Sequence, residues 1–267
     1  MSSFNILSIA GTDPSGGAGI QADLKAFSAL GGYGMSVVTA LVAQTTTGVT
    51  EVLDVPPEFV TSQLDTLLGD VRVDAVKIGM LSTTGVIEAV AGAIDRHGLT
   101  RIVLDPVMVA KSGDRLLAAD AIEAVRSELL PRADLITPNL PEAADLLGEP
   151  EAVDLDGMRA QAERLVKLGA RRVLLKGGHL DGENSTDLLV GPEGEAETFT
   201  AARVATDNTH GTGCTLSSAI AALRPQRATW SQAVGDAKRY LTEALRRADE
   251  LEVGHGKGPV HHFHAWW

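Results

Sequence analysis

Short apolar runs of strand length alternate with longer segments of helical periodicity through the first two thirds of the chain, and this alternation constrains the fold most. Residues 5–10 form an apolar run of strand length, and residues 18–30 then carry alanine and leucine at helical spacing. Parallel strands need a crossover between them, which is usually a helix. We therefore expect an α/β fold with a mostly parallel central sheet, covered by helices on both faces.

The same pattern gives a set of expected elements. We expect strands at residues 5–10, 35–43, 49–55, 74–78, 101–104, 135–136 and 171–175. We expect helices at residues 18–30, 57–68, 84–96, 118–129, 141–147, 155–168, 215–223 and 230–245. Runs at 186–190 and 196–200 flank a Gly-Pro-Glu-Gly turn, which predicts an antiparallel edge hairpin. With no repeat and no linker, we expect a single domain over residues 1–267.

Charge and cysteine content exclude several classes of function. The 35 acidic and 23 basic residues give a formal net charge of −12, so we expect no nucleic-acid or anionic-membrane partner. Cys214 is the one cysteine, which excludes an intrachain disulfide and a cysteine-based zinc site. The N-terminus lacks a basic signal-peptide region, and no apolar run approaches the ~18 residues of a membrane span. We expect a soluble, cytoplasmic protein.

Two glycine-rich segments lie where a strand or loop leads into a helix. Gly211, Thr212 and Gly213 open a predicted helix, whose free amides and positive dipole end would bind an anion. An ordinary glycine turn at a helix start is the alternative. The segment lacks the Gly-Lys-Ser/Thr of a phosphate-binding P-loop and the third glycine of a dinucleotide fingerprint. The first loop, residues 11–19, also has the wrong glycine spacing for a dinucleotide site and is compatible with a close-packed turn.

Charged and amide side chains follow several predicted strands, where ligands bind in α/β sheets. Asp105 and Glu142 lie at neighbouring strand ends, and together they would hold Mg²⁺ through water. Taken singly, Asp105 is compatible with a turn, and Asn139 with Glu142 is typical of a helix-capping pair. Lys176 ends an apolar strand and needs a partner, which is either a phosphate or Asp105.

Four of the seven histidines, His255, His261, His262 and His264, lie in the last thirteen residues. Neither cysteine nor a carboxylate cluster accompanies them, and they lack the spacing of a helical zinc motif. We therefore expect a surface or packing role for them rather than a metal site.

These motifs, taken in order, resemble the hydroxymethylpyrimidine/phosphomethylpyrimidine kinases of thiamine biosynthesis, a family within the ribokinase-like superfamily. The resemblance runs from end to end of the chain. It is carried by residues 9–23, 39–45, 77–80, 103–107, 137–142, 175–179, 208–214 and 258–264. It implies a ribokinase-like fold, a homodimer, and ATP-dependent phosphorylation of 4-amino-5-hydroxymethyl-2-methylpyrimidine, first to the monophosphate and then to the diphosphate.

The resemblance also implies a role for each matching residue. Gln44 would hydrogen-bond the pyrimidine, because an amide both donates and accepts. The residues implied around that ring are Asp23, Gly11, Val42 and Met80. On the ATP side, Lys176 would contact phosphate and Asn139 belongs to the same motif as the Mg²⁺ ligands Asp105 and Glu142. The anion hole and catalytic group would be Gly211, Thr212, Gly213 and Cys214.

Cys214 would stand where related sugar kinases carry an aspartate base. We expect the helix N-terminus to lower the pKa of its thiol toward neutrality, so that it serves as the base for the hydroxymethyl group. The alternative is a small buried cysteine that only packs the start of the helix. The second acceptor is an ionised phosphate that needs no base. A fixed aspartate charge would repel that phosphate, whereas a cysteine is able to be neutral when it arrives.

Three competing functions remain to be distinguished. A pyridoxine or pyridoxal kinase shares the superfamily and a hydroxymethyl-bearing ring, and a kinetic comparison of the two substrates would decide. A non-catalytic pyrimidine-binding module would release no ADP in a coupled assay. A nicotinamide dehydrogenase is disfavoured by the glycine spacing.

Overall fold

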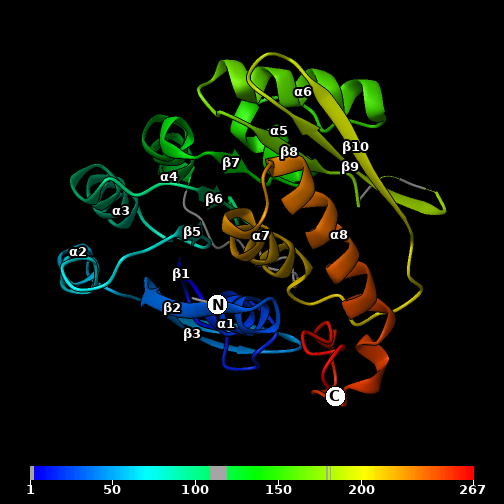
Figure 1. The fold of residues 1–267 in the computed structure, drawn as a ribbon, viewed down its shortest axis with the longest axis horizontal. Coiled ribbons are helices and arrows are strands. Elements are labelled where there is room, and N and C mark those ends of the chain that lie inside the picture. Colours follow the sequence, from blue (N-terminus) through cyan, green and yellow to red (C-terminus); the bar gives the residue numbers. More distant parts are fainter. Residues whose placement is uncertain (1–2, 109–118, 179, 181) are drawn as a thin grey trace.

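The computed structural model describes residues 3–108, 119–178, 180 and 182–267. At its centre is an eight-stranded sheet in the order β10-β9-β8-β7-β6-β5-β1-β2 (Figure 1). Its strands are β1 (Phe4–Ala10), β2 (Gly32–Val38), β5 (Ala75–Ile78), β6 (Ile102–Leu104), β7 (Leu135–Ile136), β8 (Val173–Lys176), β9 (Asn184–Val190) and β10 (Ala196–Ala202). The chain starts in β1, adds β2 on one side and then extends the sheet on the other side from β5 onward.

The sheet is parallel from β2 through β8, and the β9–β10 hairpin adds two antiparallel pairings at its edge. The expected mostly parallel sheet with an edge hairpin is therefore confirmed. The chain adds β2 on one side of β1 and later adds β5 on its other side, so the strand order reverses between β1 and β5. In open α/β sheets, ligands bind in the crevice at the carboxyl ends of the strands that flank such a reversal.

Helices cover both faces of the sheet, as expected. Side chains alternate along each strand, so Leu7 and Ile9 enter one core while Ile6 enters the other. The first face carries α2 (Pro57–Leu68), α3 (Thr84–His97), α4 (Ala119–Ala124), α5 (Leu140–Leu147) and α6 (Leu155–Lys167). The second face carries α1 (Gly19–Ala29), α7 (Thr212–Leu223) and α8 (Trp230–Arg246).

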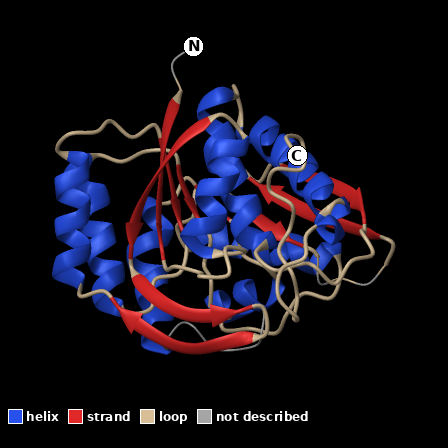
Figure 2. Ribbon diagram, turned by 90° about the horizontal axis from the view of Figure 1, so that it is seen from below, coloured by secondary structure: helices blue, strands red, loops and turns tan. Residues whose placement is uncertain are grey.

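Two of the expected elements differ in the structure. The strand expected at 35–43 is divided, because Thr39 leaves the main sheet and its hydroxyl donates to the carbonyl of Met80 at 2.9 Å. β3 (Ala40–Thr45) then pairs with β4 (Gly48–Asp54) in a separate antiparallel sheet, which Figure 2 shows as two strands crossing one end of the molecule. The helix expected at 118–129 begins at a residue outside the described part, and it continues beyond Ala124 as one π-helical turn, Val125–Leu129.

The small sheet has two unlike faces. Ala40 and Val42 are buried, whereas Leu41 and its cross-strand partner Leu53 are largely exposed. The buried side points toward the ends of the central strands. In the described part of the chain, no helix is both long and apolar enough to span a membrane.

Candidate active site

A cavity of about 690 Å³ opens at the carboxyl ends of the central strands. The small sheet lines one end of it through Val42 and Gln44, and α7 and α8 line the other end through Leu216 and Leu241. Apart from Asp23, all of the site residues expected from the sequence line it. They are Gly11, Val42, Gln44, Met80, Asp105, Asn139, Glu142, Lys176, Gly211, Thr212, Gly213 and Cys214. The topology therefore brings residues from segments far apart in the sequence into one site.

The start of α7 is built to receive an anion. Gly211 is the N-cap residue with φ 74°, and a Cβ atom there would lie 1.8 Å from the carbonyl oxygen of Gly17, so only glycine fits. The amides of Gly213 and Cys214, in the first turn, donate to no described residue. With the positive end of the helix dipole, they form an anion hole that faces the cavity.

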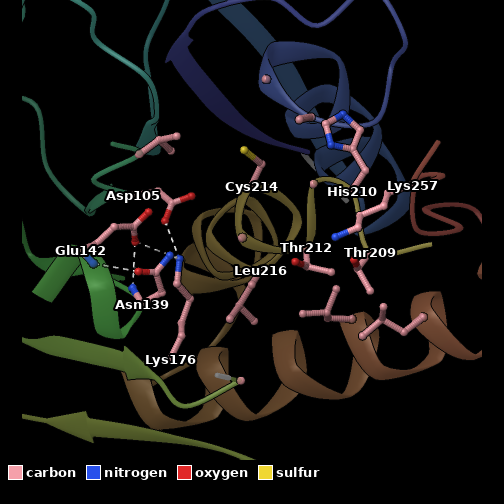
Figure 3. Close-up of a pocket in the computed structure, with 18 of the residues that line it drawn as sticks. Asp105, Asn139, Glu142, Lys176, Thr209, His210, Thr212, Cys214, Leu216 and Lys257 are labelled. Atoms are coloured by element: carbon pink, nitrogen blue, oxygen red, sulfur yellow. Dashed lines mark hydrogen bonds and ion pairs between the residues drawn. The ribbon is translucent and has the colours of Figure 1, made fainter. Parts of the chain in front are cut away.

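A lysine and two carboxylates gather beside that hole, as the dashed lines in Figure 3 mark. Lys176 Nζ lies 2.9 Å from Asp105 Oδ1 and 3.7 Å from Glu142 Oε2. Thr137 donates to the same Asp105 oxygen at 2.9 Å. Burial acts to raise the pKa of Asp105, but Lys176 and Lys77 outweigh it, so the pKa lies below its usual range. Asp105 is therefore a carboxylate that is already neutralised by lysine.

Glu142 is the second carboxylate, and besides Lys176 it contacts Asn139, with which it exchanges two hydrogen bonds. Its Oε2 accepts from the amide of Asn139 at 2.8 Å, and Asn139 Oδ1 accepts from the amide of Glu142 at 2.8 Å. This capping box confirms the helix-capping interpretation of the pair, and both side chains still line the cavity. Burial, together with repulsion from Asp105, raises the pKa of Glu142 to about 7 despite the nearby Lys176.

The oxygens of Asp105 and Glu142 suit a magnesium ion better than a structural transition metal. The described residues contain no group of three or more His, Cys, Asp or Glu side chains able to enclose a metal. Mg²⁺ needs no such cage, because it keeps several waters and uses one or two carboxylates together with phosphate oxygens. A second positive charge here would also favour ionised Glu142. The residues present thus fit Mg²⁺.

Cys214 lies in the first turn of α7 and points into the cavity (Figure 3). Burial raises the pKa of its thiol to about 11; Lys77 opposes this, while Asp23 and Asp105 add to it. The expectation of a pKa lowered toward neutrality is therefore wrong. Loss of hydration and two nearby carboxylates outweigh the charge of Lys77 and the hydrogen bond from the Gly19 backbone, so the thiol is un-ionised at neutral pH.

Asp23 was expected beside the substrate, but it lies behind the cavity wall. It is fully buried, and its oxygens accept from Lys77 at 2.8 and 2.9 Å, from Ser8 at 2.6 Å and from Ser218 at 2.6 Å. These bonds occupy the carboxylate, so it holds Lys77 rather than a ligand. Lys77 itself lines the cavity and was missed by the sequence analysis, although a lysine inside the apolar strand β5 was a signal for a buried partner.

The end of the cavity under the small sheet has one polar pair and apolar walls. Gln44 Nε2 lies 3.4 Å from His210 Nε2, which is itself 2.7 Å from Asp13 Oδ2. Burial acts to raise the pKa of Asp13, but bonds from His210 and Ser15 lower it to about 2. A Cβ on Gly11 would lie 2.8 Å from Met80 Cε, so glycine keeps this end open. His210 was missed, although it stands inside the glycine-rich segment.

The opposite end of the cavity is an apolar slot that no sequence motif predicted. Leu216 of α7, Leu241 and Leu245 of α8, and Val204 after β10 line it. These residues come together only because α8 packs across both α7 and β10. Nothing in the local sequence distinguishes them from other core leucines.

The C-terminal histidines do not line this cavity, and one of them, His262, supports it from outside. His262 lies 2.9 Å from the hydroxyl of Thr215, next to the anion hole, and burial lowers its pKa to about 3. It is therefore neutral. His261 is also buried, whereas His255 is exposed. The expected packing or surface role is confirmed for these three. His179, in one of the motifs, lies outside the described residues.

Comparison with known proteins adds an independent line of evidence. The sequence model of the phosphomethylpyrimidine kinase family matches residues 13–261. The hydroxymethylpyrimidine/phosphomethylpyrimidine kinase of Escherichia coli strain K12 is 59% identical over 267 residues, which cover 100% of both chains.

Solved structures of pyridoxal kinases have the same fold. An ADP complex of Bacillus subtilis pyridoxal kinase matches with a TM-score of 0.90 and 38% identity over 98% of each chain. Staphylococcus aureus pyridoxal kinase in complex with AMP-PCP and pyridoxal matches with a TM-score of 0.90 and 32% identity, over 100% of this chain and 96% of the other. These matches confirm the expected ribokinase-like architecture.

Proposed function

This chain belongs to the phosphomethylpyrimidine kinase family, and we propose that it phosphorylates 4-amino-5-hydroxymethyl-2-methylpyrimidine twice with ATP. The observation that carries the proposal is that a polar end at Gln44 and an apolar slot at Leu216 lie in one shared cavity, on either side of the anion hole of α7. The pyrimidine ring would occupy the first and the purine base of ATP the second. The transferred phosphoryl group then lies at the anion hole between them.

In the first step the hydroxymethyl oxygen attacks the γ-phosphorus of ATP. An oxygen–phosphorus bond forms, the bond from the γ-phosphorus to the bridging oxygen breaks, and ADP and a proton leave. Such transfers depend mainly on positioning and on neutralising charge. Lys176 would contact the phosphate, the amides of Gly213 and Cys214 would bind its oxygens, and Asp105 and Glu142 would hold Mg²⁺ through water. When bound, Mg²⁺ supplies further neutralisation of the phosphate charge.

The second step has the newly formed phosphate as its acceptor. Because Cys214 is un-ionised at neutral pH, it places no fixed negative charge against that phosphate. One site would thereby accept a neutral alcohol and then an anion. At the other end, Gln44 would donate to and accept from the polar edge of the pyrimidine, and Val42 and Met80 would cover its faces.

Mass spectrometry of the products from the hydroxymethyl pyrimidine, ATP and Mg²⁺ tests this function. We expect the monophosphate to appear first and the diphosphate to follow. A purified chain that binds the pyrimidine without forming either product would instead be a binding module. The intact set of Lys176, Asp105 and Glu142 at the anion hole argues against that alternative.

Pyridoxal phosphorylation is the second candidate activity, because pyridoxal kinases share this fold with a TM-score of 0.90. The relative that is 59% identical favours the pyrimidine as the main substrate. Comparison of kcat/KM for the two substrates decides between them. A higher value for pyridoxal would overturn the order proposed here.

We also infer a homodimer, in the cytoplasm where ATP is supplied. The exposed, cross-strand pair of Leu41 and Leu53 on the outer face of the small sheet is 50% and 63% exposed and supports such an interface. Light scattering of the wild-type protein and of Leu53→Glu tests it. A monomeric wild-type protein would contradict the inference.

A further inference from the structure

A second hollow, of about 460 Å³, lies at the other end of strands β8 to β10 from the active cavity. Arg172 lines it just before β8, Arg224 lines it in the turn after α7, and Trp230 begins α8 there. Arg172 precedes the strand that ends at Lys176, so the length of β8 separates this hollow from the anion hole. The two are therefore different sites.

Two guanidinium groups in this hollow have no carboxylate partner among the described residues. The Cζ atoms of Arg224 and Arg172 lie 5.1 and 5.9 Å from the centre of the Trp230 ring. The buried Nε of Arg224 has no hydrogen-bond partner, and its Nη1 donates to the carbonyl of Arg227 at 2.7 Å. A buried donor without a partner costs free energy, so an acceptor bound beside Arg224 Nε would stabilise the protein.

The positive charges around Arg224 also favour the binding of an anion. The pKa of Arg224 is lowered, first by burial and then by repulsion from Arg101 and Arg172. Asp134 acts in the other direction, but it already forms an ion pair with Arg171 at 2.9 Å. Glu195 and Glu197 also line the hollow, and Glu195 turns back to accept from the amide of Glu193 at 2.9 Å. Among the described residues neither glutamate forms an ion pair with Arg172 or Arg224, so the two guanidinium groups keep their positive charge in a chain of net charge −12.

The start of α8 provides further donors at the same place. The helix begins at Trp230 after the N-cap Thr229, whose hydroxyl accepts from Gln232. The amides of Trp230 and Ser231 donate to no described residue. They stand at the positive end of a 17-residue helix, beside the two arginines.

We propose that this hollow binds a small phosphate-bearing anion, separately from the active cavity. Guanidinium forks and helix-start amides are the donors that recognise phosphate oxygens, and the Trp230 ring offers an apolar face to the remainder of such a molecule. The volume suits a small ester or diphosphate, and the acidic surface elsewhere disfavours a long polyanion. Because α8 also lines the apolar slot through Leu241, an occupant would stiffen the helix that borders both sites.

Isothermal titration with inorganic pyrophosphate, without Mg²⁺, tests the proposal. We expect two sites per chain in the wild-type protein, one at the anion hole and one in the hollow. Arg172→Gln/Arg224→Gln should lose the second site or weaken it at least tenfold, with kinase activity unchanged. Arg239→Gln is the matched control, since Arg239 lies on α8 but pairs with Asp236. Lys176→Ala should affect only the first site.

Two outcomes would overturn the proposal. One is a single site in the wild-type protein, and the other is a second site that keeps its affinity in the double variant. Circular dichroism checks that the double variant is folded. If it is not, Arg172→Gln alone serves the same purpose, because its side chain donates no hydrogen bond to a described residue. Failure here would leave the kinase activity, which is measured independently, untouched.

Discussion

Two lysine–aspartate pairs lie side by side in this protein and have opposite characters. Lys77 with Asp23 is completely buried, and Ser8 and Ser218 complete the bonding of the carboxylate. Lys176 with Asp105 stands at the end of β8, faces the cavity, and has Glu142 as a second carboxylate at 3.7 Å. The first pair is satisfied, so it behaves as scaffold. The second brings one lysine and two carboxylates to the cavity beside the anion hole, so it behaves as a site.

The largest loss of stability is expected when the fully hydrogen-bonded pair of Lys77 and Asp23 is broken. Lys77→Met leaves Asp23 buried with only two hydroxyl donors, and the loss of one partner of a buried pair typically costs about 3–5 kcal/mol. Urea denaturation should show a fall of that order in the free energy of unfolding. The exposed pair Arg159 and Glu163 offers a control, because Arg159→Met should cost under about 1 kcal/mol. Equal losses in the two variants would remove the distinction between scaffold and surface pairs.

The next prediction concerns the unsatisfied pair. Lys176→Ala and Asp105→Asn should each lower kcat by about 10²–10³-fold, the usual loss when one preorganised electrostatic contact is removed. Thermal denaturation should change much less than in Lys77→Met, since the cavity admits water to the remaining partner. An unchanged kcat with a lower melting temperature would make Lys176 and Asp105 a second structural pair.

Gln44 tests whether the polar end of the cavity selects the substrate. Gln44→Leu keeps a similar volume but removes a donor and an acceptor, which costs a buried partner about 1–3 kcal/mol. The KM for the pyrimidine should therefore rise about tenfold or more, on the scale of 1.4 kcal/mol per tenfold. The KM for ATP should stay constant. A parallel rise in both constants would mean that Gln44 supports the fold through His210 instead.

The same comparison shows which features were predictable from the sequence. The strand ends that carry Asp105, Glu142 and Lys176 were found because polar residues after apolar runs mark the crevice of a parallel sheet. Asp23, on α1, was misplaced because its partner Lys77 comes from the distant strand β5 and its burial depends on packing. The division at Thr39 was missed because residues 35–43 are mostly apolar and contain neither glycine nor proline to mark a break. The slot at Leu216 and Leu241 exists only once α8 crosses α7, and no local pattern records that crossing.

Glu142, beside Lys176 and Asp105, should make the stability of the protein depend on pH. Its pKa is raised to about 7 in the folded protein, above its ordinary value of 4.5, so the folded state binds the extra proton. Stability from this group is therefore present below pH 4.5 and is lost as the pH rises through about 7. Glu142→Gln retains a capping side chain and should flatten the stability profile between pH 5 and 8. A profile as steep as that of the wild-type protein would assign the titration to another group.

The smallest expected effect belongs to Cys214, which lies within the field of both lysines. With a pKa of about 11 its thiol is un-ionised at neutral pH, so a serine hydroxyl reproduces its charge and nearly its size. Cys214→Ser should then slow each phosphorylation by only a few-fold, and by similar factors, in single-turnover measurements of the two steps. A selective loss of the first step would instead mean that bound substrate lowers the thiol pKa and that Cys214 acts as its base. Cys214→Asp is the opposing control: a fixed charge ~4 Å from the phosphate acceptor would repel it by several kcal/mol at an effective dielectric of about 20, so the second step should fail. If both steps survive that change equally, the phosphate does not approach Cys214, and the residue only packs the start of α7.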